Sequence, residues 1–517
     1  MMNRIIFSLF SLVFLFTSCT VYKKTTATDD GRISINFVQI NDVYEIAPLN
    51  NGKEGGIARV ATLKKKYVQE NKNTMLLMAG DFLSPSVYNS LKYKGESIKG
   101  KQMVEALNAA GLDIAIFGNH EFDIKEAELQ QRINESSFQW ISSNTFHKKK
   151  DGKISPFAKT NTGKPEDPFP KTFIKTFTDA DGTTAKIGFF AVTLPFNKAS
   201  YVFYEDALAA AKKSFSYLID SVDAVIAITH QTIEEDRILA SEIPGLSLIM
   251  GGHEHDQHFE KHWDIYISKA MANARSAYVL TLNINKKNKQ VSVTPKLEKM
   301  DEQVALDSNT HKVVTKWVNI ANESYAALGF EPGKIIVNNM QPLDGRETEV
   351  RSYSTNLCKL IVSAMQSAAP QSPVVIMNAG SIRVDDILQM PVTQYDILRT
   401  LPYGGAIKEA DITGSLLVQI LDAGTKNKGT GGYLLYNETI RYNPELKNWS
   451  IGDTVIDPAK IFRVALTDFL LTGGEANLDF LKPGNSGILK VYDTENSLSN
   501  PRADIRRAVI QYLQARQ

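Results

Sequence analysis

Five short polar clusters in this sequence carry side chains of the types that bind metal ions. They are Asn41-Asp42-Val43-Tyr44, Gly80-Asp81, Gly118-Asn119-His120-Glu121-Phe122-Asp123, Thr229-His230 and Gly251-Gly252-His253-Glu254-His255. Their carboxylate, amide and imidazole donors, with no thiolate among them, suit zinc, manganese or iron. A single histidine is more often structural than a ligand, but clusters repeated in one context predict a two-metal site. The predicted ligands are Asp42, Asp81, Asn119, His230, His253 and His255.

A short apolar run precedes each cluster and predicts the strand that positions it. The runs are residues 34–40, 74–79, 113–117, 224–228 and 246–250, and amphipathic helix candidates lie between them, for example at 57–67 and 103–107. Alternation of strand and helix predicts an α/β fold. In open α/β sheets the carboxyl ends of the strands converge on the ligand site, so we expect the polar clusters to meet in space.

The composition is that of an ordinary globular protein, with 43% hydrophobic and 22% charged residues. At about 100–200 residues per domain, the chain is expected to form two to four domains. Its formal charge of +1 excludes bulk electrostatic attraction, so no nucleic acid polymer is expected as a partner. The cysteines Cys19 and Cys358 are too few for a disulfide framework or a cysteine-rich zinc module.

The N-terminus predicts export. Arg4 precedes an apolar run at residues 5–16, which is shorter than the roughly 20 residues of a membrane-spanning helix and indicates a signal peptide at 1–18. Its end resembles a bacterial lipoprotein signal, which implies that Cys19 is lipidated; an ordinary cleaved signal is the alternative. Residues 19–32 then form a polar tether. The expected location is the bacterial cell envelope, lipid-anchored at the periplasmic or surface face of the outer membrane.

The polar clusters resemble the motifs of the calcineurin-like metallophosphoesterases, and specifically of the exported 5'-nucleotidase/UDP-sugar hydrolase family. The resemblance covers nearly the whole mature chain. It implies two groups of ligands and a bridge: Asp42 and His255 for one metal, Asn119, His230 and His253 for the other, and Asp81 between them. It also implies that His120 stabilises the transition state and that Asp123 orients the His120 imidazole.

Tyr44 departs from the family pattern, which has a histidine ligand at this position. A phenol ionises near pH 10, so Tyr44 binds as phenolate only beside a strong Lewis acid, and ferric iron favours this more than zinc. Alternatively, Tyr44 packs or forms a hydrogen bond, and the first metal keeps only Asp42, Asp81 and His255 from the protein. Both alternatives stay open at this point.

The same resemblance implies the domain organisation. It predicts a four-layer α/β/β/α metallophosphoesterase sandwich at 33–300, a helical linker at 301–334, and an α+β nucleotide-recognition domain at 335–517. Residues 306–327 have the apolar spacing of a helix, and Pro332-Gly333 follows as a breaker. The run at 147–172, rich in Lys, Gly and Pro, is expected to be a surface insertion.

In the C-terminal segment the resemblance implies a set of substrate-binding residues, which are Arg351, Asn378, Arg383, Tyr403, Phe469 and Glu475. Tyr403 and Phe469 match two aromatic residues that sandwich the base, and such stacking contributes roughly 1–3 kcal/mol per base. Glu475 stands where the family has aspartate, and Ser354 where it has glutamate. Base and sugar preference are therefore not predicted.

Together these residues predict a metal-dependent hydrolase of nucleotide phosphate esters, with a nucleoside 5'-monophosphate as substrate and two divalent ions of zinc, manganese or iron as cofactors. A cyclic-nucleotide phosphodiesterase or a nucleotide-sugar hydrolase is the alternative within this class. A non-catalytic metal- or nucleotide-binding lipoprotein is the alternative from another class. The lipid anchor is the only expected contact with a membrane, and the oligomeric state stays open.

Overall fold

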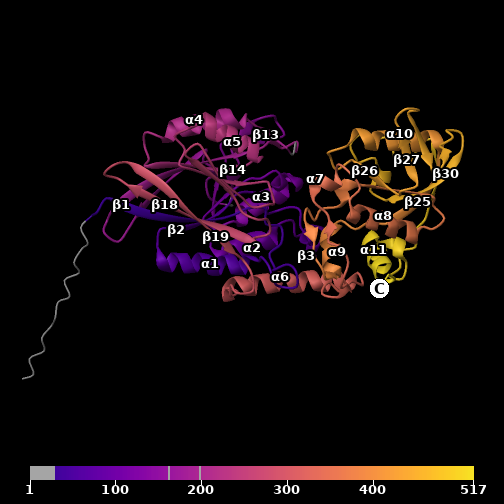
Figure 1. The fold of residues 1–517 in the computed structure, drawn as a ribbon, viewed down its shortest axis with the longest axis horizontal. Helices are drawn as coiled ribbons and strands as arrows, with labels where there is room; N and C mark the ends of the chain where they lie inside the picture. The colour runs from indigo at the N-terminus through magenta and orange to yellow at the C-terminus, as the bar shows by residue number, and fades with distance from the viewer. Residues whose placement is uncertain (1–28, 161–162, 197–198, 517) are drawn as a thin grey trace, which may run out of the picture.

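The computed structural model describes residues 29–160, 163–196 and 199–516. The predicted signal peptide at 1–18, Cys19 and most of the predicted tether lie outside the described residues. The described chain forms two halves that lie side by side, the N-terminal half in indigo to pink and the C-terminal half in orange to yellow (Figure 1). None of the helices in the described ranges has the length and apolar character that crossing a bilayer requires.

Two six-stranded sheets form the N-terminal half. The first has the order β19-β18-β1-β2-β5-β6, with β1 (Arg32–Ile40), β2 (Thr74–Met78), β5 (Ile114–Ile116), β6 (Gln139–Ile141), β18 (Ser276–Asn285) and β19 (Gln290–Lys299). The second has the order β11-β12-β14-β15-β17-β16, with β11 (Thr172–Thr178), β12 (Thr184–Thr193), β14 (Ala224–His230), β15 (Leu248–Gly252), β16 (His258–His262) and β17 (Ile265–Lys269). The strands predicted before the polar clusters are confirmed as β1, β2, β5, β14 and β15.

The central strands of each sheet are parallel, so their carboxyl ends lie at one edge. In the first sheet β1, β2, β5 and β6 run parallel, with Val38 opposite Leu76. In the second, β12, β14, β15 and β17 run parallel, with Ile228 opposite Met250. Each sheet therefore delivers the residues that follow its strands to a common edge.

Alternating side chains along the strands separate inner and outer layers. On the first sheet, Phe37 and Leu77 face inward and pack with Phe189 of the second sheet. Val38 faces the helices α1 (Ile57–Glu70), α2 (Lys101–Ala110) and α3 (Glu126–Glu135). The outer face of the second sheet is covered by α4 (Ala207–Leu218) and α5 (Ile233–Glu242). This is the predicted α/β/β/α order of layers.

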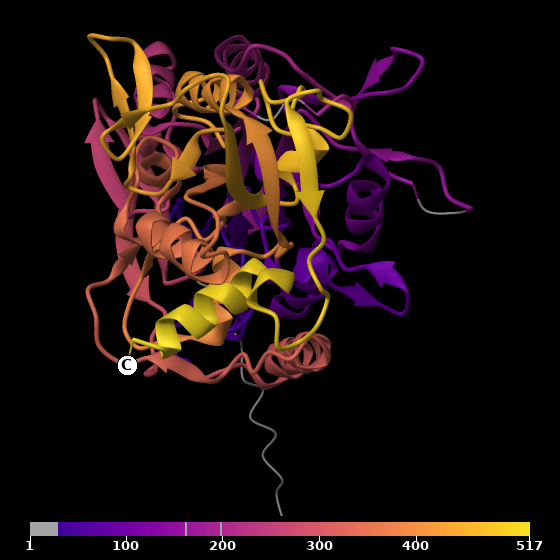
Figure 2. The same ribbon diagram turned by 90° about the vertical axis from the view of Figure 1, so that its right-hand side faces the viewer.

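The C-terminal half is α+β. Its mixed sheet has the order β26-β22-β30-β25-β31, with β22 (Val374–Asn378), β25 (Ile407–Thr413), β26 (Leu434–Tyr436), β30 (Ile461–Thr467) and β31 (Ile488–Tyr492). Val374 and Ile376 face α10 (Gly414–Lys426), whereas Val375 and Met377 face α8 (Asn356–Ala368) and α11 (Ile505–Gln514). Figure 2 shows this half facing the viewer, with α11 in front.

The helix α6 (Ser308–Ala327) joins the two halves along one side (Figure 1), and it confirms the helix predicted at 306–327. Asp307 caps it by accepting a hydrogen bond from the Thr310 N–H. Trp317 and Tyr325 are fully buried in a hydrophobic cluster that runs from the outer helices of the first sheet into α8 and α11. The halves thus share one continuous core.

Shorter elements complete the fold. They are β3 (Lys92–Tyr93), β4 (Glu96–Ser97), β7 (Thr145–Lys148), β8 (Ile154–Ser155), β9 (Ala158–Lys159), β10 (Asp167–Pro168), β13 (Val202–Tyr204), β20 (Ile335–Val337), β21 (Leu343–Asp344), α7 (Glu347–Val350), β23 (Ile387–Leu388), β24 (Val392–Thr393), α9 (Gln394–Thr400), β27 (Ile440–Asn443), β28 (Asn448–Ile451) and β29 (Thr454–Val455). The run at 147–172 is not wholly a surface insertion, because Phe157 and Phe169 are buried and pack on Phe117 and Trp140. The lysines and glycines that dominate this run in the sequence made Phe157 and Phe169 difficult to recognise as core residues.

Candidate active site

The carboxyl ends of strands from both sheets meet at one edge of the N-terminal half, where buried amides join them. The Gln39 side chain donates to the Gly251 carbonyl at 2.9 Å and to the Ser268 carbonyl at 2.8 Å. Asn41 exchanges two hydrogen bonds with the Ala270 backbone, at 2.8 and 2.9 Å. These bonds hold β1 against β15 and β17, so the polar clusters after β1 and β15 face each other.

Asp42, Asp81 and His230 form the centre of the site, with ligand atoms that all lie within 4.8 Å of one another. His230 Nε2 is 3.1 Å from Asp81 Oδ2 and 3.9 Å from Asp42 Oδ1. His255 Nε2 is 3.7 Å from Asp42 Oδ1, and the Tyr44 hydroxyl is 3.0 Å from His255 Nε2 and 3.4 Å from Asp81 Oδ2.

The other two predicted ligands border this centre. The centroids of the His253 and His230 rings are 5.4 Å apart. The backbone N–H of His253 donates a hydrogen bond to Asp42 Oδ2 at 3.0 Å. Asn119 is buried beside His120, whose backbone N–H donates to Asp81 Oδ1 at 2.7 Å. The structure therefore brings together the predicted metal ligands, which we call the cage: Asp42, Tyr44, Asp81, Asn119, His230, His253 and His255.

Backbone strain supports the cage. Asp42 (φ 53°), Asp81 (φ 55°) and His253 (φ 86°) all have positive φ, a conformation that costs free energy for residues other than glycine and that collects at functional sites. Gly118 makes room for Asp81, because a Cβ there would lie 2.1 Å from Asp81 Oδ1. The chain passes closer to the ligands than any larger residue would allow.

The cage fits metal ions on two grounds. Asp42 Oδ1 and Asn119 Oδ1 are buried and have no hydrogen-bond partner among the described residues. Buried polar atoms are normally paired, so these two oxygens need a ligand that the protein itself does not supply. Burial, with a contribution from His230, lowers the pKa of His253 to about 3, so its ring is neutral at pH 7 and has a lone pair to donate.

Hydrogen bonds behind the cage fix two of the imidazoles. His230 Nδ1 lies 2.8 Å from the Ala79 carbonyl, which leaves Nε2 for a metal. His255 Nδ1 lies 3.0 Å from Asp385 Oδ2 in the C-terminal half. Bonds of this kind set the tautomer and the orientation of a metal-binding histidine.

His120 and Asp123 form the predicted catalytic pair beside the cage. His120 Nδ1 lies 2.7 Å from Asp123 Oδ2, and Arg383 Nη2 donates to the same oxygen at 2.9 Å. Although burial opposes the shift, Asp123 and Asp81 raise the pKa of His120 to about 9. The ring is therefore protonated at neutral pH, and Nε2 can offer a proton to a substrate oxygen.

Glu121 was not singled out from the sequence, although it lies within the third polar cluster. Its buried carboxylate accepts hydrogen bonds from the N–H groups of Gly118 (2.6 Å), Asp81 (2.9 Å), Phe82 (2.7 Å) and Leu83 (3.0 Å). These bonds hold the turn that carries Asp81 against the turn that carries Asn119. In the sequence, the available indication of this role was an acidic residue placed between a histidine and a phenylalanine.

Lys269 was also missed. It is fully buried at the end of β17, where its ammonium donates to the carbonyls of Gln231 at 2.6 Å and Gly252 at 2.8 Å. Asp236 Oδ2, at 3.0 Å, and Glu254 offset its charge. Lys269 thus connects the turns after His230 and before His253. A lysine that ends an apolar strand was the indication in the sequence.

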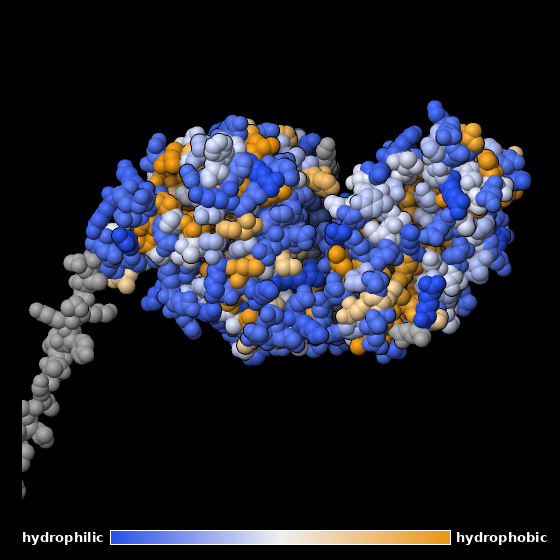
Figure 3. All heavy atoms as spheres, in the orientation of Figure 1, coloured by the Kyte–Doolittle hydropathy of each residue, from blue (hydrophilic) through white to orange (hydrophobic). Residues whose placement is uncertain are grey.

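The substrate residues predicted in the C-terminal half line two cavities that also include residues of the N-terminal half. The surface of the molecule is notched between the two halves (Figure 3). A cavity of about 770 Å³, which we call the aromatic cavity, is lined by Asp123, Asn378, Arg383, Tyr403, Phe469 and Glu475. Arg351 is not among its lining residues. It lines a cavity of about 890 Å³ with His253 and His255, and its guanidinium pairs with Glu347 at 2.6 Å.

The two aromatic side chains predicted to sandwich the base are exposed in this cavity. Tyr403 is 56% exposed and Phe469 is 43% exposed, so both side chains are accessible. Glu475 Oε2 accepts a hydrogen bond from the Asn378 side chain at 2.7 Å, which fixes the polar wall of the cavity. Glu475 and Asn378, both predicted to bind substrate, thus lie together on this wall.

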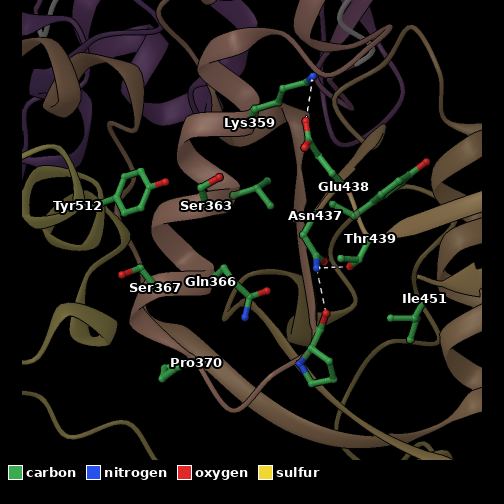
Figure 4. Close-up of a pocket in the computed structure, with 13 residues that line it drawn as sticks. Lys359, Ser363, Gln366, Ser367, Pro370, Asn437, Glu438, Thr439, Ile451 and Tyr512 are labelled. Atoms are coloured by element: carbon green, nitrogen blue, oxygen red, sulfur yellow. Dashed lines mark hydrogen bonds and ion pairs between the residues drawn. The ribbon is translucent and has the colours of Figure 1, made fainter. Parts of the chain in front are cut away.

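A further hollow of about 770 Å³ lies on the C-terminal half between α8, α11 and the turn after β26 (Figure 4). Its polar groups bond to each other, as in the Lys359–Glu438 ion pair at 3.0 Å and the bond from Asn437 to the Pro373 carbonyl at 2.9 Å. None of its described lining residues belongs to the predicted site.

Fold and donor set together define a class, the metal-dependent phosphoesterases, and comparison with known proteins agrees. A calcineurin-like phosphoesterase model matches residues 35–257, and a 5'-nucleotidase C-terminal domain model matches residues 335–482. The trifunctional nucleotide phosphoesterase protein YfkN of Bacillus subtilis is 25% identical over 519 residues, covering 90% of this chain and 34% of YfkN. This chain thus spans about a third of that relative.

Two further relatives match along most of their length. The 5'-nucleotidase of Bos taurus is 24% identical over 488 residues, covering 81% of this chain and 78% of that protein. The crystal structure of a 5'-nucleotidase precursor from Thermus thermophilus shares the fold, with a TM-score of 0.66 and 19% identity, covering 93% of this chain and 96% of that one. The chain belongs to the 5'-nucleotidase family of calcineurin-like phosphoesterases and is a metal-dependent hydrolase of nucleotide phosphoesters.

Proposed function

We propose that this protein hydrolyses nucleoside 5'-monophosphates to the nucleoside and inorganic phosphate. The observation that carries the proposal is that Asp123 lines the aromatic cavity and bonds to His120, whose backbone N–H in turn donates to Asp81 of the cage. In the proposed pose the base lies between Tyr403 and Phe469, which line the cavity, and the 5' end points toward the cage. One bound molecule can therefore meet both regions.

The proposed metal site has two positions that share one carboxylate. Asp42 and His255 border one position, Asn119, His230 and His253 border the other, and Asp81 faces both. Zinc, manganese and iron suit these donors. When bound, such ions supply Lewis acidity and positive charge that stabilises the phosphoryl oxygens.

Tyr44 contributes to the first position in this proposal. Its hydroxyl oxygen lies 3.0 Å from His255 Nε2 and 3.4 Å from Asp81 Oδ2, so it faces the same space as those two ligand atoms. An oxygen at this place fills the position of the histidine that the family pattern has there. A phenolic oxygen favours a harder ion than an imidazole does.

The side chains around the cage have separate proposed tasks. His120 holds a proton at Nε2 for a phosphoryl or leaving-group oxygen, and Asp123 fixes its ring by accepting a hydrogen bond from Nδ1–H. Arg383 adds positive charge beside Asp123. Arg351 is buried next to the histidines of the cage, and its Nε has no partner among the described residues, so it is placed to contact a substrate phosphate.

The aromatic cavity supplies the proposed nucleoside contacts. Tyr403 and Phe469 stack on the base, which contributes roughly 1–3 kcal/mol per base and tolerates different bases. Asn378 and Glu475, joined by their hydrogen bond, face the sugar. These contacts position the ester so that the reacting atoms meet the cage.

A panel of phosphate esters tests the proposal. We expect phosphate release from AMP, GMP, CMP and UMP with manganese, zinc or iron, and slower turnover of ribose 5-phosphate, which has no base to stack. Faster hydrolysis of a cyclic nucleotide or of UDP-glucose would replace the proposed substrate class with one of those. Binding of AMP without turnover in any of the metals would identify a non-catalytic binder.

We also propose that the protein is exported, that Cys19 carries a lipid, and that the units at 33–300 and 335–517 act as catalytic and substrate-recognition domains joined by 301–334. The support is the sequence pattern at 1–19 and the placement of α6 between the halves. Metabolic labelling with a fatty acid tests the anchor. The label should appear on the protein and disappear in Cys19→Ser.

A further inference from the structure

One short loop of the C-terminal half, residues 383–386, contacts three side chains of the N-terminal half. Arg383 donates to Asp123 at 2.9 Å, Asp385 Oδ2 lies 3.0 Å from His255 Nδ1, and Asp386 forms an ion pair with Arg275. Two of these contacts reach the proposed site directly, one at the catalytic pair and one at the cage. The loop therefore connects the docking of the C-terminal half with the geometry of the site.

We propose that Asp385 is a positioning residue for the metal site: it holds His255 as the Nδ1–H tautomer and turns Nε2 into the cage. The inference rests on the proposed function, because it takes His255 as a metal ligand. It adds that one ligand of the N-terminal half is oriented by a carboxylate from the other half. The first metal position is then complete only when the two halves are docked.

The contacts of His255 allow only one tautomer of its neutral ring. Asp385 offers two acceptors to Nδ1, the side-chain Oδ2 at 3.0 Å and the backbone carbonyl at 3.2 Å. Only a protonated Nδ1 can donate to them, so the lone pair of the neutral ring is on Nε2. Nε2 lies 3.7 Å from Asp42 Oδ1, on the side of the other ligands.

Asp385 itself is held in place. Its Oδ1 accepts the Glu347 N–H at 2.5 Å, so each carboxylate oxygen has its own partner. Its φ of 37° lies in the left-handed region, which asparagine and aspartate adopt more readily than most residues. Backbone strain at this position is typical of residues kept for a task.

The consequence is a change in metal affinity. Removing a carboxylate that orients a metal-binding histidine typically costs about 10–100-fold in metal affinity. Asp385→Asn is the suitable variant, because asparagine keeps the shape and tolerates positive φ. Asp386→Asn is the matched control: it changes the neighbouring residue of the same loop and breaks the ion pair with Arg275, but it does not touch His255.

The experiment measures manganese binding to the full chain by competition with a chelator, together with phosphate release from AMP. We expect Asp385→Asn to weaken one of two manganese sites by about 10–100-fold, and Asp386→Asn to change neither site by more than about threefold. Equal effects of the two variants, or no effect of Asp385→Asn, would overturn the inference. A wild-type chain that binds none of manganese, zinc and iron would instead overturn the proposed function.

A spectroscopic measurement tests the tautomer of His255 in the wild-type chain itself. With the histidines labelled with ¹⁵N and the His255 signals assigned by comparison with His255→Gln, the metal-free protein is expected to show a proton on Nδ1 of His255. A proton on Nε2 alone would contradict the inference.

Discussion

The cage and the aromatic cavity are built in opposite ways. Asp42 and His230 are fully buried, whereas Tyr403 and Phe469 are 56% and 43% exposed. Backbone groups also form hydrogen bonds with the side chains of the cage. The backbone N–H of His253 donates to Asp42 Oδ2, and His230 Nδ1 lies within hydrogen-bond distance of the Ala79 carbonyl. The cage is preorganised, while the aromatic cavity has two exposed aromatic side chains.

This difference shows where precision is needed. Metal ligands and a proton donor must keep fixed positions in order to stabilise a transition state, so the chain accepts backbone strain at Asp42, Asp81 and His253. Stacking on a base tolerates small shifts and different bases. We therefore expect changes at the cage to reduce turnover and changes in the cavity to weaken substrate binding.

Metal removal is the largest expected effect. Dialysis against a chelator should abolish phosphate release from AMP, and adding back manganese, zinc or iron should restore it. The melting temperature should fall as well, because ions that bind only the folded state stabilise it by mass action. Full activity and an unchanged melting temperature after verified metal removal would show that the cage has no catalytic role.

His120→Ala should lower turnover by about 10²–10⁴-fold, the usual contribution of a general acid–base group. The His120 ring bonds to Asp123, and only the backbone N–H of His120 donates to Asp81 of the cage. Because the substitution keeps that backbone group, metal content should stay close to that of the wild type. Turnover and metal content measured on the same preparation check this. Equal losses in both would assign His120 to metal binding.

Tyr403→Ala and Phe469→Ala should each raise the KM for AMP by about 5–150-fold, which corresponds to roughly 1–3 kcal/mol of stacking. The value of kcat should change little, because neither ring touches the cage. Ribose 5-phosphate is the internal control, since it has no base and its KM should not respond. A drop in kcat with unchanged KM would instead assign these rings to catalysis.

Tyr44→Phe is expected to give the smallest effect, about a tenfold loss of affinity at one metal position with the other unchanged. The hydroxyl oxygen is one of several groups facing the first position, next to Asp81 and His255, so its loss leaves other ligands in place. Chelator competition measures the two affinities. Unchanged binding at both positions would show that Tyr44 only packs against the cage.

The positions of the cage residues followed from the sequence because strands have a simple pattern. An apolar run such as 224–228 that ends in Thr229-His230 predicts both the strand and the edge at which His230 lies. Parallel strands then collect such ends at one place, even across the two sheets. The four-layer order and the two-part organisation were predicted from the family resemblance rather than from periodicity.

Residues that act from behind the site were not predictable in this way. Glu121 and Lys269 serve backbone groups, and the sequence does not show which carbonyl or N–H group a side chain will reach. Asp385 contacts His255 only because the halves dock, and this contact joins positions 130 residues apart. Long-range placement of this kind depends on the packed structure.

The most direct test of the cage is an anomalous diffraction measurement on crystals of the protein soaked in manganese. We predict two peaks on either side of Asp81, about 3.5–4 Å apart as in other two-metal sites. One should lie beside Asp42 and His255, and the other beside Asn119, His230 and His253. Absence of both peaks from a soaked crystal, or manganese bound only elsewhere, would contradict the proposed two-metal site.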